Sequence, residues 1–298
     1  MPELRVFANQ SALNYALAEA VASTINSAVR ARKKCSIALA GGTTPKRLYK
    51  LLATDFKKHV RWRQVYVFWG DERLVSPGSA QRNDRMAREM LLSHVPCPER
   101  HIHPMATRAK QSPEDAAREY EATMRQHFAD GRPRFDLVLL GLGAEGHTAS
   151  LFPDSPALDE RERWVCPVRV PATPSQRLTL TLPVFSEAAN VFFLAMGSAK
   201  AHALRSAISS DADPKKCPAA AITPVDGRVT WWVDAPAAGS SRDRDSHKDP
   251  DMHKGAVEET EHDPIVPIRP VGANYDDSEV SNADEKGQTT DSPRDEQR

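Results

Sequence analysis

The chain has 298 residues, of which 40 % are hydrophobic, and its 40 Asp and Glu residues balance its 40 Lys and Arg residues. This composition supports a folded core and argues against a membrane-spanning protein, because no run approaches the roughly 18 to 20 apolar residues that a spanning helix needs. The first residues lack the basic start and apolar stretch of a signal peptide, so we expect a cytoplasmic protein that does not bind membranes.

The predicted elements alternate between helix and strand from the N-terminus onward. Apolar residues recur at four-residue intervals over 13–29, which predicts a helix with Ser11 as its N-cap. The apolar run 35–40 predicts a strand, and Thr44 is placed to cap the helix that follows. Residues 65–69 form another strongly β-prone run, which ends at a glycine.

The alternation continues with a helix over 112–128 and a strand over 135–140, and further strands are predicted at 177–182, 191–196 and 228–233. The earlier strands are continuously apolar, which indicates burial on both faces. Together with the intervening helices they predict a single-domain α/β fold, a mostly parallel, Rossmann-like sheet with helices on both faces. Ligands of such sheets bind outside the carboxyl ends of the strands. Three loops follow strands there, and they begin at Gly41, Gly70 and Gly141.

Residues 237–298 differ in composition from the rest of the chain. They contain 16 acidic and 8 basic side chains, whereas residues 1–236 contain 24 acidic and 32 basic ones. The acidic segment, rich in Ser and Pro, cannot bury enough apolar surface to offset chain entropy, so we predict a disordered tail after a folded domain 1–236. The basic domain suits a small anionic ligand. Nucleic acid is not expected as a partner, because no basic block is interleaved with aromatic residues.

The first loop contains two glycines and two threonines ahead of a predicted helix: Gly41, Gly42, Thr43 and Thr44. Glycines allow close backbone approach, and the N–H groups of a helix N-terminus attract anions, so the loop can cradle a phosphate. It lacks the Gly-Lys-Ser/Thr ending of a Walker loop. A tight turn into a capped helix explains the same residues equally well.

The second loop places Asp71, Glu72 and Arg73 directly after a buried strand. Arginine can hold an oxyanion or a phosphate through two parallel hydrogen bonds. The alternative is a structural ion pair that tethers the loop.

The third loop, 141–150, has glycines on both sides of Glu145 and places His147 at the apparent start of a helix. A helix N-terminus disfavours imidazolium, so His147 is expected to be neutral near pH 7. A neutral imidazole can take a proton from water, and a nearby carboxylate can orient it. The alternative is a structural histidine.

Other constellations carry weaker signals. The pair His101 and His103 lacks carboxylates at ligand spacing and suggests a surface loop rather than a metal site. The four cysteines are scattered and indicate reduced thiols. Ser150 is not part of a Gly-x-Ser-x-Gly elbow, so a serine hydrolase is not supported.

The three loops, in this order, resemble the 6-phosphogluconolactonase family of the glucosamine/galactosamine-6-phosphate isomerase superfamily. Ala-Gly-Gly-Thr-Thr-Pro at 40–45 is similar to its Ser-Gly-Gly-Ser-Thr-Pro segment, and 69–73 followed by Asn83 is similar to its Gly-Asp-Glu-Arg…Asn segment. Residues 141–153 resemble its Leu-Gly-x-Gly-x-Asp-Gly-His-Thr-Ala-Ser-Leu-Phe-Pro signature. The resemblance extends over about 1–236 and not into the tail.

The resemblance implies hydrolysis of 6-phosphoglucono-δ-lactone by water, without a metal or an organic cofactor, on the α/β fold shared with glucosamine-6-phosphate deaminases. It implies His147 as the general base, with Glu145, Asp71 and Arg73 in the catalytic centre and Arg73 on the oxyanion. It also implies a phosphate clamp, formed by Gly41, Gly42, Thr43, Thr44, Arg177 and Lys200. We expect the enzyme to act as a monomer on this small phosphosugar.

Two alternatives stay open. An amino-sugar-phosphate deaminase on the same fold carries Ile-Ala-Phe-Asn-Glu-Pro after its histidine, whereas 148–153 here contains no carboxylate, which favours the lactonase. A non-catalytic sugar-phosphate sensor is suggested by Glu145, which stands where the family usually has Asp, and by the tail. One extra methylene displaces the carboxylate by about 1 Å, which can cost about 100-fold in rate.

Overall fold

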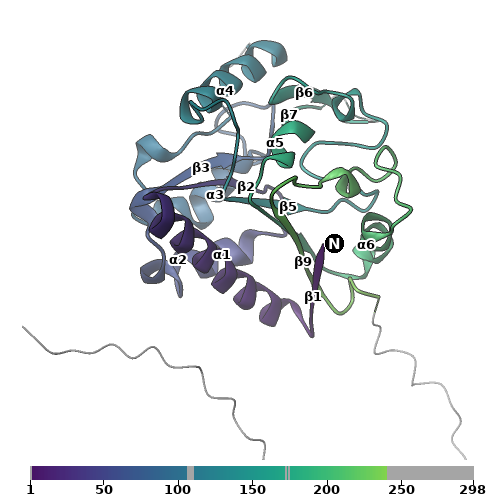
Figure 1. Cartoon of the computed structure of the whole chain (residues 1–298), viewed down its shortest axis with the longest axis horizontal. Coiled ribbons are helices and arrows are strands. Elements are labelled where there is room, and N and C mark those ends of the chain that lie inside the picture. Colours follow the sequence, from purple (N-terminus) through teal and green to yellow (C-terminus); the bar gives the residue numbers. More distant parts are fainter. Residues whose placement is uncertain (1, 106–110, 172, 174, 240–298) are drawn as a thin grey trace, which may run out of the picture. The chain divides into compact units, whose positions relative to one another are not determined.

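A six-stranded parallel sheet organises the residues that this computed structural model describes, 2–105, 111–171, 173 and 175–239 (Figure 1). Its spatial order is β1-β9-β8-β5-β2-β3, and each neighbouring pair is parallel. The strands are β1 (Glu3–Phe7), β9 (Arg228–Asp234), β8 (Asn190–Ala195), β5 (Leu137–Gly141), β2 (Cys35–Leu39) and β3 (Val65–Trp69). The five strands predicted in this sheet are confirmed, and so is the burial predicted for the three earlier ones, of which β2 is buried at every position. The prediction missed β1, because this edge strand is mostly exposed and lacks a long apolar run.

A second, antiparallel sheet lies beside the first and has the order β4-β7-β6: β4 (Asp71–Arg73), β7 (Gln176–Leu180) and β6 (Val165–Arg169). The predicted strand 177–182 belongs here, and the expectation of a loop after Gly70 is wrong because the chain continues into β4. Gly70 joins the two sheets: its N–H donates to Leu39 O at 3.1 Å, and its carbonyl accepts from Leu180 N at 2.9 Å.

Six α-helices are seen among the described residues: α1 (Gln10–Arg32), α2 (Lys46–Ala53), α3 (Asn83–Met90), α4 (Pro113–His127), α5 (Leu182–Ser186) and α6 (Ala201–Ile208). Short 3₁₀ turns connect them at Lys57–His59, Trp62–Gln64, Leu92–His94, Glu99–His101, Pro156–Leu158, Ser198–Lys200 and Pro218–Ala221. In Figure 1, α1 and α2 lie on the opposite side of the parallel sheet from α4. The helix predicted over 112–128 is confirmed as α4, with Ser112 as its N-cap. The two predicted caps differ, since Asn9 rather than Ser11 caps α1, and Pro45 rather than Thr44 precedes α2.

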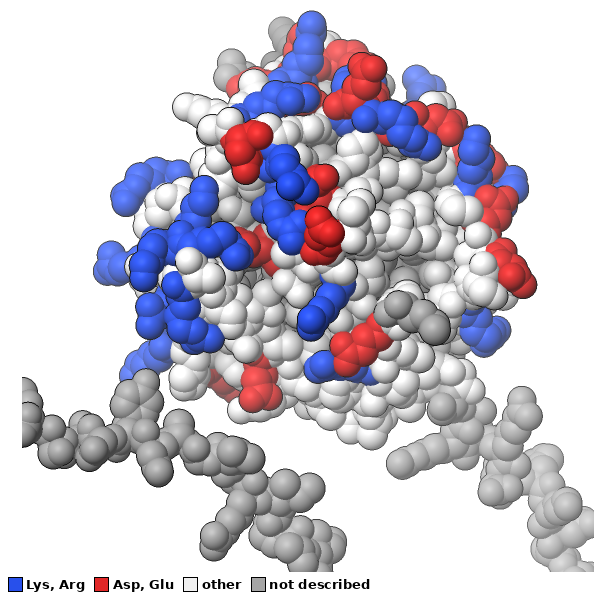
Figure 2. All heavy atoms as spheres, in the orientation of Figure 1, with Lys and Arg blue, Asp and Glu red and all other residues white. Residues whose placement is uncertain are grey.

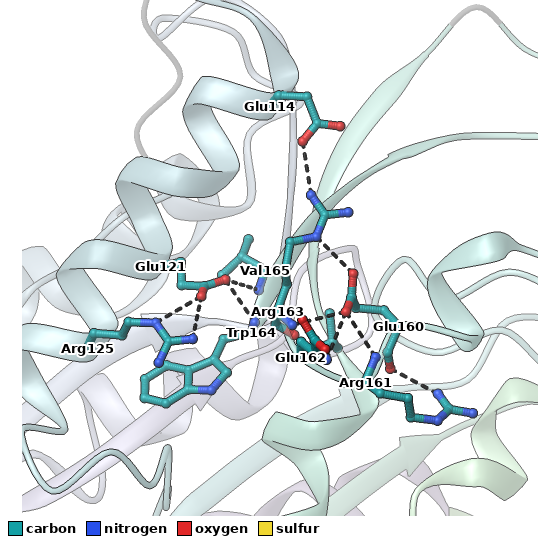
Figure 3. Close-up of polar contacts among 10 residues, drawn as sticks. Glu114, Glu121, Arg125, Glu160, Arg161, Glu162, Arg163, Trp164 and Val165 are labelled. Atoms are coloured by element: carbon teal, nitrogen blue, oxygen red, sulfur yellow. Dashed lines mark hydrogen bonds and ion pairs between the residues drawn. The ribbon is translucent and has the colours of Figure 1, made fainter.

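A polar network fastens α4 to the second sheet (Figure 3). The carboxylate of Glu121 accepts the N–H groups of Trp164 at 2.8 Å and Val165 at 3.2 Å. Arg125 binds the same carboxylate, and its guanidinium lies 4.2 Å from the centre of the Trp164 ring. In the turn that precedes β6, the carboxylate of Glu160 accepts three successive backbone N–H groups, those of residues 161–163. The small sheet is therefore held at its outer strand, β6.

The crossover pattern defines where a ligand can enter. From β2 the chain leads to β3 on one side, and from β5 it leads to β8 on the other, although β2 and β5 are neighbours. Such a switch point leaves a crevice at the carboxyl ends of the two strands. No helix in the described part of the chain is long and apolar enough to span a membrane.

The packed chain continues just past the predicted domain boundary at 236. Ala237 is buried, and its N–H donates to the carboxylate of Asp234 at 2.9 Å. Residues 240–298 of the predicted tail lie outside the described residues.

Candidate active site

A pocket of about 220 Å³ occupies the crevice at the carboxyl ends of β2 and β5. Nine of the ten residues predicted for the site line it: Gly41, Gly42, Thr43, Thr44, Asp71, Arg73, His147, Arg177 and Lys200. The three segments that the sequence placed after strands therefore meet, and Lys200 joins them from the segment after β8. The tenth residue, Glu145, instead lines a neighbouring pocket of about 380 Å³ beside α6.

His147 connects the two pockets: its side chain lines the first pocket, and one ring nitrogen contacts Glu145 of the second. Its Nδ1 lies 2.9 Å from Glu145 Oε1. An ionised carboxylate can only accept, so this contact places the proton on Nδ1 and leaves the lone pair on Nε2. The ring packs against Phe152 at a centroid distance of 4.8 Å. A Cβ on Gly143 would lie 2.0 Å from Nδ1, so only glycine leaves room for the ring here.

The expectation that His147 begins a helix is wrong, and the predicted effect of a helix dipole on this ring does not apply. Residues 142–155 form turns, apart from an isolated bridge between Thr148 and Leu151. Local hydrogen bonds hold the segment instead: Gly143 N donates to His147 O at 2.8 Å, and Thr148 Oγ1 donates to Gly141 O at 2.8 Å. Ala149 has a φ of 48°, which reverses the chain before a helix can form.

The Glu145 carboxylate is suited to orient the imidazole. Burial alone would raise the pKa of Glu145, but its own backbone N–H, His147 and Lys200 together lower the pKa below its ordinary value. The carboxylate is therefore ionised at neutral pH. The longer side chain at a position where the family usually has Asp still brings a carboxylate oxygen to hydrogen-bond distance of the ring.

Arg73 and Arg177 face each other across the ladder between β4 and β7. Arg73 Nη1 donates to Gln81 O at 2.6 Å, but the buried Nε atoms of both arginines lack a hydrogen-bond partner among the described residues. Burial lowers the pKa of Arg177, Asp71 opposes that shift, and neighbouring Arg73 adds to it. Two adjacent guanidiniums with unpartnered donors are chemically suited to bind an anion.

Asp71 and Glu72 have different surroundings although they are neighbours. Glu72 is fully buried and caps α3, accepting the N–H of Asn83 at 2.8 Å and of Asp84 at 2.9 Å. Burial raises the pKa of Glu72 to about 7 against the lowering effect of these bonds. Asp71 lies at the pocket and is bound by Asn83 and Ser150. Sequence reasoning assigned no role to these two partners, although Asn83 belongs to the second motif and Ser150 to the third.

The first loop turns sharply at Gly42, whose φ of 80° favours glycine. Gly41 has a different constraint, since a Cβ there would lie 2.0 Å from Asn83 Oδ1. The loop leads directly into α2, which begins with Lys46 and Arg47. On the face in Figure 2, Lys and Arg side chains gather over the flank where Figure 1 shows α2.

The histidine pair outside the site does not lie in a surface loop, so that interpretation is wrong. His101 is buried and stacks on Tyr66 at 3.9 Å, and His103 stacks on Phe68 at 4.6 Å. Across the described residues, no three His, Cys, Asp or Glu side chains are grouped so that they could hold a metal ion. The four cysteines are free thiols.

Comparison with known proteins agrees with this geometry. Residues 8–231 match the family described as glucosamine-6-phosphate isomerases/6-phosphogluconolactonase. The 6-phosphogluconolactonase of Synechocystis sp. is 42 % identical over 244 residues, which span 81 % of this chain and 99 % of that protein. A probable 6-phosphogluconolactonase 2 of Oryza sativa subsp. indica is 35 % identical and covers 80 % and 89 %. The solved structure of 6-phosphogluconolactonase from Trypanosoma cruzi superposes with a TM-score of 0.70 at 31 % identity, covering 81 % of this chain and 97 % of that one. The chain therefore belongs to the glucosamine-6-phosphate isomerase/6-phosphogluconolactonase family.

Proposed function

We propose that this protein is a 6-phosphogluconolactonase, which hydrolyses 6-phospho-D-glucono-1,5-lactone to 6-phosphogluconate in the oxidative pentose phosphate pathway. The observation that carries the proposal is the placement of His147. Its ring is oriented by the Glu145 carboxylate at 2.9 Å and borders a pocket that also holds Arg73, Arg177 and Lys200. A base and several cations in one pocket fit an ester that carries a phosphate.

In the proposed reaction, Nε2 of His147 takes a proton from water as the water oxygen bonds to C1 of the lactone. The tetrahedral intermediate then collapses, the bond between C1 and the ring oxygen breaks, and the imidazolium returns its proton to that oxygen. The new carboxylic acid releases one proton to solvent, so water and lactone give 6-phosphogluconate and H⁺. A well-placed general base contributes about 10² to 10⁴ in rate.

The cationic residues divide the remaining work. Arg73 stabilises the oxyanion, a contribution of about 3 kcal/mol for one such donor. Arg177, Lys200 and the loop 41–44 bind the phosphate, and this remote contact orients the lactone carbonyl toward His147. Asp71 offsets part of the charge of Arg177, which lies 3.7 Å away.

The assay that tests the proposal follows lactone hydrolysis as acid release, with spontaneous hydrolysis subtracted. Turnover by the purified protein supports the lactonase. Lactone binding without turnover would favour the sensor, and ammonia release from glucosamine 6-phosphate would favour the deaminase. No observation in the structure favours either alternative, and segment 148–153, where the deaminases carry a glutamate, contains no carboxylate.

We also propose a monomeric, cytoplasmic enzyme whose catalytic domain is the predicted segment 1–236 with the few packed residues that follow. The pocket supports this division, because the residues that line it fall between Leu39 and Lys200. Truncation after Gly239 is expected to leave kcat and KM unchanged. A loss of turnover in that variant would assign the tail a part in catalysis.

A further inference from the structure

The buried carboxylate of Asp71 links the third loop to the start of α3 through Ser150 and Asn83. The residue is 6 % exposed, and Oδ2 accepts the hydroxyl of Ser150 at 2.6 Å. Its Oδ1 accepts Asn83 Nδ2 at 3.1 Å. Because both oxygens of the carboxylate already accept hydrogen bonds, Asp71 is poorly placed to act as a second general base. Its contacts instead suit it to hold neighbouring side chains in position.

Ser150 links Asp71 to the anion-binding arginine in a fixed direction. The serine has one hydroxyl proton, which it donates to Asp71, so its oxygen is left to accept from Arg177 Nη1 at 3.4 Å. The side chain is fully buried, and its backbone N–H donates to Thr179 Oγ1 at 3.2 Å. Thr179 belongs to β7, the strand that carries Arg177. Ser150 therefore has two attachments to that strand, three residues after His147 in the chain.

Asn83 fixes the other side of Asp71. Its Nδ2 donates to the backbone oxygen of Asp71 at 2.8 Å as well as to the carboxylate, and the residue is 1 % exposed. Its Oδ1 occupies the space that a side chain at Gly41 would need. Asn83 thus sets the separation between the first loop and β4.

We propose that Ser150 and Asn83 are positioning residues: Ser150, directly and through Asp71, and Asn83, through Asp71, hold Arg177 at a fixed place relative to His147. The inference rests on the proposed lactonase function for its kinetic consequence, but its binding consequence is independent of that function. Without the Ser150 hydroxyl, Asp71 keeps its direct contact with Arg177. The hydrogen bonds from Arg177 to Ser150 and from Ser150 to Asp71, which fix the orientation of the guanidinium, are lost. The arginine then shifts relative to the base, and a displacement of about 1 Å can reduce turnover about 100-fold.

The test compares Ser150→Ala with Ser36→Ala. Ser36 is a matched control, because it is also a buried serine whose hydroxyl makes one short side-chain bond, 2.7 Å to His127 Nε2, at the other end of the sheet. For Ser150→Ala we expect kcat/KM to fall 10- to 100-fold and the Kd for inorganic phosphate to rise about tenfold. We expect the two variants to lower the Tm by similar amounts. Ser36→Ala should change neither kcat/KM nor the Kd for inorganic phosphate.

A double-mutant cycle separates positioning from general loss of structure. In an Arg177→Ala background, Ser150→Ala should have less than a twofold further effect on phosphate affinity, since the arginine through which it acts is gone. Additive losses, or a Ser150→Ala protein that matches the wild type, would overturn the proposal. Asn83→Ser, which retains a shorter donor, should give a smaller loss of the same kind and serves if Ser150→Ala fails to fold. A wild-type protein without lactonase activity would sink the proposed function, yet the phosphate cycle would still decide on the positioning residues.

Discussion

His147 and His127 lie at opposite ends of the parallel sheet, and the contrast between them shows what makes a histidine suitable for catalysis. His127 lies at the C-terminus of α4, and its Nε2 is 2.7 Å from the hydroxyl of Ser36 near the start of β2. Its ring is surrounded by Phe68, Phe128 and Tyr66 at centroid distances of 5.0, 4.8 and 4.8 Å. His147 instead follows β5, contacts a carboxylate and borders a pocket.

The two histidines have the same side chain, but their neighbours suit them to different roles. Burial lowers the pKa of His127 to about 4, so the ring is neutral at pH 7, and its Nε2 is paired with the Ser36 hydroxyl. The open turn around His147 exposes one nitrogen while Glu145 fixes the other. A histidine–serine contact by itself is therefore a poor guide to a catalytic pair.

The largest expected effect comes from substituting His147, with a substitution of His127 as the comparison. His147→Ala should lower kcat by about 10² to 10⁴, because the general base is lost. His127→Gln should leave kcat and KM within about twofold, since its ring lies at the opposite end of the sheet. Steady-state lactone hydrolysis at pH 7 measures both. Equal losses in the two variants, or full activity in His147→Ala, would show that His147 is not the general base.

Gly143→Ala tests whether the backbone, rather than a helix, positions the catalytic ring. The new Cβ would meet Nδ1 at 2.0 Å, so the ring must rotate away from Glu145. We expect a loss in kcat of about 100-fold with a smaller change in KM. Gly78→Ala is the matched control, because a Cβ at Gly78 meets no atom within 4 Å. Wild-type kcat in Gly143→Ala would show that the ring has another productive orientation.

Glu145→Asp sharpens the same comparison with a smaller change. In this backbone the shorter side chain withdraws the carboxylate from Nδ1 by about 1 Å, and we expect kcat to fall 10- to 100-fold. Exposed Glu162, changed to Asp in the same way, provides the control. Activity equal to or above that of the wild type would mean that the loop adjusts to either acid, so that Glu145 is not specifically fitted to this pocket.

Much of the fold was readable because the parallel strands are continuously apolar: 35–40, 65–69 and 135–140 differ from the observed strands by at most two residues at an end. The errors arose where local pattern and tertiary contact disagree. Exposed β1 has no buried run, and polar β4 is a strand because β7 pairs with it. The helix expected at His147 is absent because turn hydrogen bonds and Ala149 compete with it.

The candidate site was predictable as far as its motifs reach. The glycine-led loops pointed to one end of the sheet, and nine residues gather there. The parts that sequence reasoning left without a role act across long separations: Ser150 meets Asp71 from 79 positions away, and Asn83 meets it from 12. A hydroxyl or an amide in a motif does not reveal its partner, so these contacts required the structure.

The smallest expected effect is the contribution of half-buried His127 to the pH dependence of stability. Burial, followed by the charges of Lys34, His103 and His101, lowers the pKa of His127 from 6.5 to about 4. The unfolded chain therefore binds a proton at His127 near pH 6.5, whereas the folded protein does so only near pH 4. The contribution of His127 to stability is fully present above its unfolded pKa of 6.5 and is lost as the pH falls toward 4. Since the ring is partly exposed and screened, we expect a loss of about 1 kcal/mol over this range.

Glu72 acts in the opposite direction, so the measurement must isolate His127. Burial raises the pKa of Glu72 from 4.5 to about 7, which makes the folded protein the better proton acceptor and lowers stability as the pH rises through that interval. Urea unfolding of the wild type and of His127→Gln at pH 4.5, 5.5, 6.5 and 7.5 cancels the contribution of Glu72 in the difference. That difference should change by about 1 kcal/mol between the extremes and remain flat above pH 6.5. A constant difference across the range would show that His127 titrates normally in the folded protein.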